Sequence, residues 1–296
     1  MQIIIPMTGY GSRFVAAGYQ ELKPFIRVQG RPILEWIVKG MYPGESNFLF
    51  ICRGEHLKSI KGMEETLCQI APGAEIYAIE DWVKLGPVYD VLRASSRIKD
   101  EEECIINYCD FYMTWDWERF KRKAVERKGD VCIPCYTGYH PHLWPPQNLY
   151  ASCKKDGEGN LLEIREKYSF EQDKKKTSHS PGVYYFASGL LLKEYCGKLV
   201  ESRETLKGEY YASMVYNFMV KDGKKVWVPD CVEQFCQWGT PEDLKDAATK
   251  IRYLENLKTI AASCIDADAF KEKAKKQYPG YSGENYLNMT AGFFFA

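Results

Sequence analysis

Short apolar runs alternate with stretches of helical periodicity over the first 108 residues of the chain. The runs that read as buried strands are Gln2–Ile5, Asn47–Cys52, Ala74–Ile79 and Cys104–Tyr108. Between them, apolar residues recur at helical spacing in Pro32–Tyr42, His56–Leu67 and Gly86–Ile98. Buried strands separated by helices predict an α/β fold, with a mixed, mostly parallel sheet and helices on both of its faces.

The second half of the chain alternates in the same way with shorter elements. The pattern predicts helices at Trp115–Arg127, Leu190–Leu199 and Glu209–Val220, strands at Val131–Cys135, Gly182–Phe186 and Lys225–Val228, a hairpin of Tyr150–Cys153 with Leu161–Glu166, and a charged loop at Phe170–Ser180. A further helix starts at Thr240, with Pro241 in its first position, and a short one follows at Asp266–Lys276. We therefore predict one α/β domain at 1–245 and a C-terminal helical extension at 246–296.

Charge and hydropathy narrow the class of protein. The 296 residues include 40 basic and 40 acidic side chains, so the net charge is zero, and 45% of the residues are hydrophobic. A balanced charge argues against a nucleic-acid partner or a membrane surface. No apolar run is long enough to span a bilayer, and no basic segment precedes the first apolar run, so we expect a cytoplasmic protein.

The cysteine pattern adds little chemistry. The chain has 11 cysteines, an odd and scattered set, which does not suit a disulfide framework. Cys132 and Cys135 have the spacing of a metal or redox pair, but no second pair accompanies them. They lie in a predicted strand, so we expect buried free thiols.

Candidate chemistry begins directly after the first strand. A glycine-rich turn at Thr8–Ser12 (TGYGS) is followed by Arg13, and Lys23-Pro24 comes ten residues later. Glycines let backbone N–H groups approach phosphate oxygens, and the cations neutralise phosphate charge. The turn lacks the GK[ST] of a P-loop and the third glycine of a dinucleotide-binding turn. This stretch therefore predicts a phosphate site of another kind.

The same stretch resembles the signature of the sugar-phosphate nucleotidyltransferases, or pyrophosphorylases, whose first loop reads GxG[ST]R followed by KP. A second match is QWGTPEDL at 237–244, which resembles the DxGTPEDL of that family. The resemblance covers residues 1–245 and implies a Rossmann-like sheet of the glycosyltransferase-A type. Within the family, the segments HSPGVYYF, GEYYASMVYNFM and FCQWGTPEDL are most similar to the CTP:phosphoglutamine cytidylyltransferases of bacterial capsule loci.

The resemblance assigns roles around the nucleotide. Thr8, Gly9, Gly11 and Ser12 would bind it, Arg13 would contact the β- and γ-phosphates, and Lys23 would lie where the two reacting phosphates meet. Gly86, in KLGPVYDVL, resembles the glycine of the GTAxAL turn that approaches the base in that family, although Pro87 replaces the usual threonine. A proline that simply starts a helix is the alternative for this turn.

Asp110 is the candidate metal ligand. It follows the strand ending at Tyr108, at the sheet edge where ligands of parallel sheets bind. A carboxylate there suits Mg²⁺ bound to phosphates, while a turn or a helix N-cap is the structural alternative. The family's second metal-binding Asp is replaced here by Gln237, a poor Mg²⁺ ligand, so Glu233 or Asp243 is a candidate substitute.

The acceptor side follows from the resemblance as well. Glu166 and Lys167 resemble the EKP motif, with Tyr168 in place of the proline, and imply contacts to the acceptor's amine or hydroxyl and to its phosphate. Gly182 would lie beside the acceptor, and Glu209 would face it. An exposed ion pair is the alternative for Glu166 and Lys167, and a first-turn acid of a helix is the alternative for Glu209.

We therefore predict a Mg²⁺-dependent nucleotidyltransferase that transfers NMP, with CTP as the favoured donor, to a small phosphorylated acceptor such as phosphoglutamine and releases pyrophosphate. The alternatives are a sugar-1-phosphate nucleotidyltransferase that uses UTP, dTTP or GTP, and an inactive nucleotide-binding paralogue. A glycosyltransferase would usually carry DxD, whereas Phe111 and Tyr112 follow Asp110. The apolar end at 293–295 is either disordered or a docking patch, which would suit a homo-oligomer.

Overall fold

The computed structural model of the chain describes residues 1–127, 131–138, 140, 143, 148–244, 257 and 259–277. The chain divides into two compact units, Met1–Gly239 and Thr240–Ala296. The assignment of catalysis to an α/β domain at 1–245, with a helical extension at 246–296, stays a prediction.

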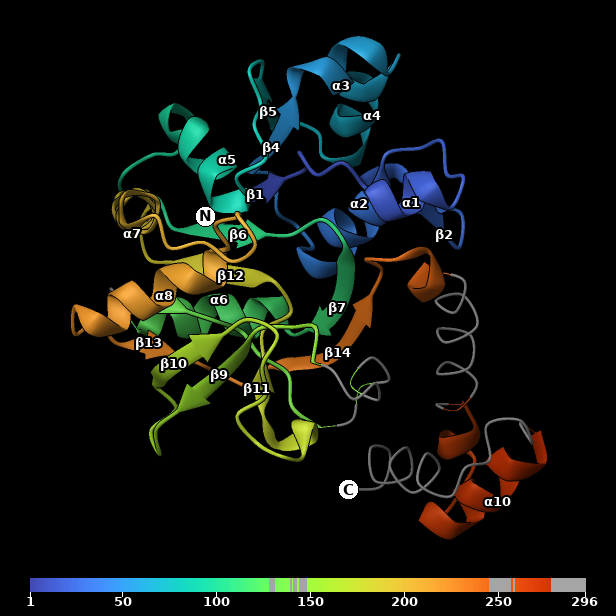
Figure 1. Cartoon of the computed structure of the whole chain (residues 1–296). Coiled ribbons are helices and arrows are strands. Elements are labelled where there is room, and N and C mark those ends of the chain that lie inside the picture. Colours follow the sequence, from blue (N-terminus) through green and yellow to red (C-terminus); the bar gives the residue numbers. More distant parts are fainter. Residues whose placement is uncertain are drawn as a thin grey trace. The chain divides into compact units, whose positions relative to one another are not determined.

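A seven-stranded sheet forms the centre of the first unit (Figure 1). Its order is β13 (Val226–Trp227), β8 (Val131–Cys132), β12 (Val183–Phe186), β6 (Cys104–Asn107), β1 (Gln2–Pro6), β4 (Phe48–Arg53) and β5 (Glu75–Ile79). The pairs of β1 with β4 and β6, of β4 with β5, and of β13 with β8 are parallel. β12 runs antiparallel to both of its neighbours. The predicted mixed, mostly parallel sheet is confirmed.

Successive residues of each strand point to opposite faces of the sheet. Both of these faces are covered. On one face a continuous apolar core joins strand residues such as Ile4, Leu49 and Ile106 to α5 (Pro87–Arg93), α7 (Gly189–Ser202) and α8 (Ala212–Lys221). On the other face, the ring of Phe48 packs against Tyr42 after η2 (Trp36–Met41), and Phe120 of α6 (Trp117–Glu126) packs against Tyr185. Helices on both faces are therefore observed as predicted.

Several predicted helices have different limits in the structure. The helix expected at His56–Leu67 is two helices, α3 (Gly54–Ser59) and α4 (Met63–Ile70), because Gly62 adopts a left-handed conformation between them. Pro32–Tyr42 is a short α2 (Ile33–Glu35) continued by η2, and Gly86–Ile98 is α5 followed by the turn η3 (Ser95–Arg97). Glu209 was predicted to open a helix, but α8 begins three residues later, so that prediction was wrong.

An antiparallel pair outside the main sheet was missed by the sequence analysis. β7 (Phe111–Trp115) follows Asp110, and β14 (Val232–Gln237) pairs with it, with Gln237 opposite Phe111 (Figure 1). The pair is anchored by Trp238, which stacks on Tyr112 at 5.6 Å between ring centroids. It brings residue 237 to residue 110 across a gap of more than a hundred positions in sequence.

The remaining elements of the first unit are small. The predicted hairpin is present as β9 (Ser152–Lys155) and β10 (Leu161–Arg165), and β11 (Ser178–His179) extends it to three strands within the predicted charged loop, next to η5 (Lys174–Lys176). α1 (Ser12–Ala16), η1 (Lys23–Phe25) and the short pair β2 (Arg27–Val28) with β3 (Arg31–Pro32) follow β1. No disulfide joins the cysteines of the described residues, and Cys132 and Cys135 are buried, as expected.

The second unit begins with the predicted cap. Thr240 and Asp243 cap each other's backbone: the Asp243 N–H donates to the Thr240 hydroxyl at 3.2 Å, and the Thr240 N–H donates to the Asp243 carboxylate at 3.0 Å. α10 (Ala267–Gln277) matches the second predicted helix. The apolar end at 293–295 lies outside the described residues. No helix in the described part of the chain combines the length and apolarity that crossing a membrane requires.

Candidate active site

One cavity of about 210 Å³ collects most of the predicted nucleotide-site residues at the carboxyl ends of β1 and β6. It is lined by Pro6, Thr8, Gly9, Tyr10, Lys23, Trp82, Lys84, Gly86, Pro87, Asp90, Tyr108, Cys109, Asp110, Glu209 and Tyr211. These residues come from five segments of the chain, 6–10, 23, 82–90, 108–110 and 209–211. The switch from β1 to its two neighbours in opposite directions opens such a crevice in an α/β sheet.

Two groups of side chains lie at this cavity, each with one member, Arg53 or Gln237, outside its lining. The first group combines two aromatic rings with three buried polar side chains. We call Thr8, Tyr10, Arg53, Trp82 and Asp90 the aromatic cluster. The Arg53 guanidinium lies 3.7 Å from the ring centroid of Tyr10 and 3.8 Å from that of Trp82, and its Nε donates to the Thr8 carbonyl at 2.5 Å. Arg53, at 3% exposed, thereby fixes both rings through cation–π contacts.

Asp90 is the acid of the aromatic cluster. It is 2% exposed, and its carboxylate accepts hydrogen bonds from the Thr8 hydroxyl and from the Trp82 indole, the latter at 3.1 Å. Burial raises the pKa of Asp90 to about 6, although these two hydrogen bonds and the charge of Arg53 act to lower it. Buried acids with a raised pKa occur at binding sites as well as in protein cores.

The second group is the charged cluster: Lys23, Asp110 and Gln237. Lys23 Nζ lies 2.7 Å from Oδ2 of Asp110, and the two side chains are 20% and 32% exposed. Asp110 is held in place from β6, where buried Asn107 accepts from the Tyr42 hydroxyl and donates to the Tyr108 carbonyl, both at 2.6 Å. Asp110 precedes a strand, so the alternative of a helix N-cap was wrong.

Gln237 reaches Asp110 through the β7–β14 pair. The Trp238 N–H donates to the Asp110 carbonyl at 3.0 Å. A Cβ built on Gly239 would lie 2.3 Å from the amide nitrogen of Gln237 and 3.4 Å from Oδ2 of Asp110, so both side chains converge on this glycine. The position at which the resemblance expects a second carboxylate is therefore beside Asp110, and it carries a neutral amide.

Gly86 forms part of the cavity floor. It has φ of 93°, and a Cβ there would lie 2.7 Å from the Tyr210 backbone nitrogen. The flanking residues bind the same neighbour: the Tyr210 N–H donates to the Leu85 carbonyl at 2.8 Å, and the Val88 N–H donates to the Tyr210 carbonyl at 3.2 Å. Only glycine fits this close crossing of two chains. Pro87 occupies the first position of α5, so the helix-start alternative is observed together with the cavity position.

The glycine-rich turn is open. Gly9 is exposed, with nothing within 4 Å of its Cβ position, and Gly11 has φ of 59° and precedes α1. Ser12 and Arg13 are exposed on the first turn of α1, and neither lines the cavity. Arg13 is nevertheless close enough to Tyr211, which does line it, to oppose the rise of that pKa to about 12 that burial causes.

Glu166, one of the predicted acceptor residues, lies near Tyr108 and Tyr211, which line the cavity. Glu166 accepts a hydrogen bond at 2.5 Å from Ser213, burial raises its pKa, and its charge contributes to the raised pKa of both tyrosines. Lys167 follows at the end of β10, exposed and with φ of 55°. The alternative of an exposed ion pair therefore does not describe Glu166, which is largely buried against a serine.

Two further residues predicted on the acceptor side, Gly182 and Glu209, lie near Tyr108 and Tyr211. Gly182 is buried with φ of 101°, and a Cβ there would lie 3.1 Å from the Tyr108 ring. Glu209 lines the cavity and forms an ion pair at 2.9 Å with Lys84. Glu209 is thus on the same cavity as Asp110, three residues before α8 rather than in its first turn.

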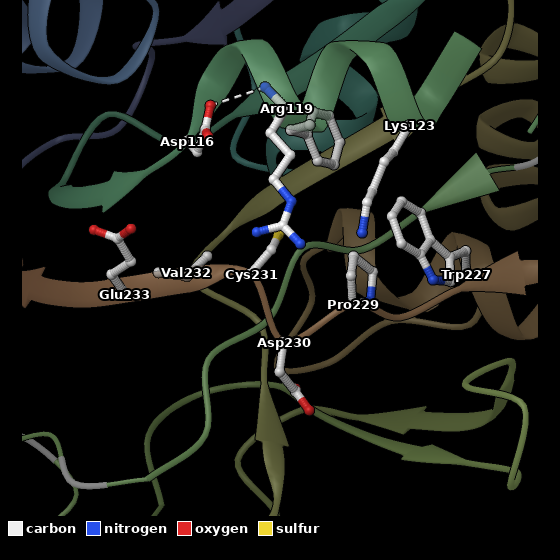
Figure 2. A pocket seen from close by; sticks show the side chains of 10 residues that line it. Asp116, Arg119, Lys123, Trp227, Pro229, Asp230, Cys231, Val232 and Glu233 are labelled. Atoms are coloured by element: carbon white, nitrogen blue, oxygen red, sulfur yellow. Dashed lines mark hydrogen bonds between the residues drawn. The ribbon is translucent and has the colours of Figure 1, made fainter. Parts of the chain in front are cut away.

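Glu233, one of the two candidate substitute ligands, lies outside this cavity. Glu233 lines another cavity, of about 300 Å³, between α6 and the start of β14, where Asp116, Arg119 and Lys123 are its charged neighbours (Figure 2). The Asp243 carboxylate accepts from the N–H and the hydroxyl of Thr240, and its assignment as a metal ligand stays a prediction. Within the described residues, no group of three or more His, Cys, Asp and Glu side chains is arranged to hold a metal ion.

The aromatic cluster, except for Thr8, was not predicted from the sequence. Tyr10 and Trp82 were visible as aromatic residues in loops next to strand ends, which is a usable signal. Arg53 and Asp90 gave no signal, because one ends an apolar strand and the other looks like an ordinary polar position of a helix. Cys109, which also lines the cavity, has a pKa raised to about 12 by burial, so it does not supply a thiolate.

Comparisons with known proteins bear on the fold. No protein-family model and no curated protein matches the chain. Among solved structures, the nucleoside-diphosphate-sugar pyrophosphorylase from Vibrio cholerae RC9 has a TM-score of 0.65 at 18% identity, covering 84% of this chain and 100% of that one. The inositol-1-phosphate CTP transferase from T. maritima has a TM-score of 0.61 at 15% identity, covering 82% and 90%.

A third similar structure is HddC from Yersinia pseudotuberculosis complexed with GMP-PN, with a TM-score of 0.57 at 16% identity, covering 84% of this chain and 99% of that one. At these identities the likeness establishes the fold alone. The chain therefore has the Rossmann-like fold of the nucleotidyltransferase structures, as the sequence predicts.

Proposed function

We propose that the chain is a nucleotidyltransferase that transfers NMP from a nucleoside triphosphate to a small phosphorylated acceptor and releases pyrophosphate. One observation carries the proposal. A single cavity brings together the exposed glycine-rich turn, Lys23, Asp110 and the Gly86 turn, which come from four separate loops. The similar structures named for nucleotidyl transfer support the same class of reaction. CTP as donor, phosphoglutamine as acceptor and a role in capsule synthesis rest on the sequence resemblance.

The reaction needs cations more than it needs a base. An oxygen of the acceptor phosphate attacks the α-phosphorus, the bond from that phosphorus to the bridging oxygen breaks, and its electron pair leaves with pyrophosphate. A phosphate dianion is already a nucleophile near neutral pH, so no proton has to move. Lys23 would neutralise the two reacting phosphates, and Arg13, beside the cavity, would stabilise the leaving pyrophosphate.

The residues present fit Mg²⁺ with few protein ligands. Asp110 offers an oxygen ligand inside the cavity, and the Gln237 amide beside it can offer a second. When bound, Mg²⁺ would screen the charge of the triphosphate. One carboxylate together with substrate phosphates is a common arrangement for this ion. Lys23 shares Asp110 in the structure, so the ammonium and the metal would both act on the same carboxylate.

A matrix of nucleotides and acceptors tests the proposal, with pyrophosphate release as the measurement. We expect release that requires Mg²⁺, with CTP and an acceptor such as phosphoglutamine. Turnover with dTTP and glucose 1-phosphate but not with CTP would contradict the choice of donor and acceptor. Nucleotide binding without pyrophosphate release from any combination would indicate a binding protein, and sugar transfer from a nucleotide sugar would indicate a glycosyltransferase.

A further inference from the structure

We propose that Asp90 reads the nucleobase, by accepting a hydrogen bond from the exocyclic amino group of cytosine and thereby selecting CTP over UTP. The inference rests on the proposed function for the presence of a nucleotide, but Asp90, Trp82 and Arg53 have no part in the phosphate chemistry. It assigns a specificity role to a side chain that the sequence did not single out.

The two clusters of the cavity suit different parts of a nucleotide. The charged cluster suits phosphates, whereas Tyr10, Trp82 and Pro87 offer the apolar and aromatic surface that a base requires. Tyr10 is 55% exposed at this surface, so a ring can stack on it. A nucleotide whose phosphates meet Lys23 therefore has its base at the aromatic cluster.

Asp90 has acceptor capacity left over at this surface. An ionised carboxylate offers about four lone-pair sites. The Thr8 hydroxyl uses one on Oδ2, and the Trp82 indole uses one on Oδ1 at 3.1 Å. Because Asp90 lines the cavity, its remaining lone pairs are available to a donor on the ligand.

The remaining lone pairs of Asp90 would distinguish cytosine from uracil. Cytosine has an amino group at position 4, which donates to a carboxylate, whereas uracil and thymine have a carbonyl oxygen there, which a carboxylate repels. Arg53 lies over the rings of Tyr10 and Trp82 and donates to the Thr8 carbonyl, which holds Trp82 and Thr8 in place. Trp82 and Thr8 in turn fix the carboxylate of Asp90. A site built to meet a donor rejects a ligand that lacks it, because the buried acceptor is then left unpaired.

The test is nucleotide binding by calorimetry with MgCl₂, using the full chain and three ligands: CTP, UTP and the triphosphate of the 2-pyrimidinone riboside, which lacks the amino group. We expect the wild-type protein to bind CTP about ten- to a hundredfold more tightly than either of the others. Equal binding of CTP and the 2-pyrimidinone analogue would overturn the proposal, and this arm needs no protein variant.

The variant Asp90→Asn is the complementary test, because its amide can donate to the uracil carbonyl. We expect the preference for CTP over UTP to fall by about tenfold or more. Asp81→Asn is the matched control, since Asp81 precedes α5, lies outside the cavity and pairs with Arg93 at the surface. An unchanged preference in a folded Asp90→Asn protein would overturn the proposal.

Different results would contradict the base-reading role of Asp90 and the proposed nucleotidyl transfer. Selective CTP binding that depends on Asp90, without pyrophosphate release from any acceptor, would leave the base-reading role intact and contradict nucleotidyl transfer. Pyrophosphate release with an unchanged nucleotide preference in Asp90→Asn would do the reverse.

Discussion

The aromatic and charged clusters share one cavity but differ in how far the fold itself uses them. Asp90, Arg53 and Thr8 are 2%, 3% and 5% exposed, and each is tied to another member of its cluster. Lys23 and Asp110 are 20% and 32% exposed, and they neutralise each other. The polar members of the aromatic cluster are therefore part of the core, while Tyr10, at 55% exposed, and the charged cluster lie at the surface. Substitutions should separate the two: loss of a charge in the charged cluster should reduce turnover, and changes beside the aromatic cluster should reduce stability.

Asp110→Asn is expected to have the largest effect. Loss of the carboxylate removes the proposed metal ligand and the partner of Lys23, so we expect kcat/KM for pyrophosphate release to fall by about a thousandfold. The free energy of unfolding should change by less than about 1 kcal/mol, because the Lys23–Asp110 pair is partly exposed.

Asp222→Asn is the matched control for this variant. Asp222 forms a similar ion pair with Lys198, also at 2.7 Å, but outside the cavity. We expect its turnover to match that of the wild-type protein. Near-normal activity of Asp110→Asn in saturating Mg²⁺ would place the metal ligand elsewhere.

Gly86→Ala should instead act through the fold. The φ of 93° and the 2.7 Å approach to the Tyr210 backbone mean that a methyl group strains the turn and displaces the neighbouring chain. We expect the free energy of unfolding to fall by about 3 kcal/mol in denaturant titrations.

Gly73→Ala separates the two causes of that loss. Gly73 also has a positive φ, of 85°, but nothing lies within 4 Å of its Cβ position. It should cost only the backbone strain, about 1 kcal/mol. Equal losses in the two variants would show that the crossing of Gly86 with Tyr210 does not constrain the cavity floor.

How much the sequence revealed also differs between the clusters. Lys23 and Asp110 of the charged cluster were predictable because they follow apolar strands, and strand ends of a parallel sheet meet at one edge. The aromatic cluster was not, because Arg53 ends the apolar strand β4 and Asp90 lies within α5. Their roles arise from tertiary contacts over tens of residues, which local periodicity does not report.

The fold shows the same division. The parallel strands and the helices between them were predicted from local patterns, with errors mostly at the ends of elements. The β7–β14 pair was missed because its strands are more than a hundred residues apart, and their pairing depends on the stacking of Trp238 on Tyr112 rather than on a hairpin turn. Without that pair, the sequence could not show that Gln237 lies beside Asp110.

Arg13→Ala tests whether the charged cluster extends beyond the cavity lining. Arg13 is exposed on α1, yet its charge reaches Tyr211. If it stabilises the leaving pyrophosphate, kcat should fall by about a hundredfold in steady-state assays. Arg97→Ala is the control, since Arg97 pairs with Glu75 at the surface. A change confined to KM would show that Arg13 only helps the nucleotide to bind.

Gln237→Asp is expected to have the smallest effect and sharpens the comparison most directly. A second carboxylate beside Asp110 should lower the Mg²⁺ concentration for half-maximal turnover by about tenfold, because a hard cation prefers an anionic oxygen to an amide. Without Mg²⁺, two neighbouring carboxylates repel and compete for Lys23, so the variant should unfold more easily and regain stability when Mg²⁺ is added. Gln234→Asp, three residues earlier on β14, carries the same change of charge and should show neither effect. An identical Mg²⁺ titration for Gln237→Asp and the wild-type protein would remove residue 237 from the charged cluster and leave Asp110 as its sole metal-binding candidate.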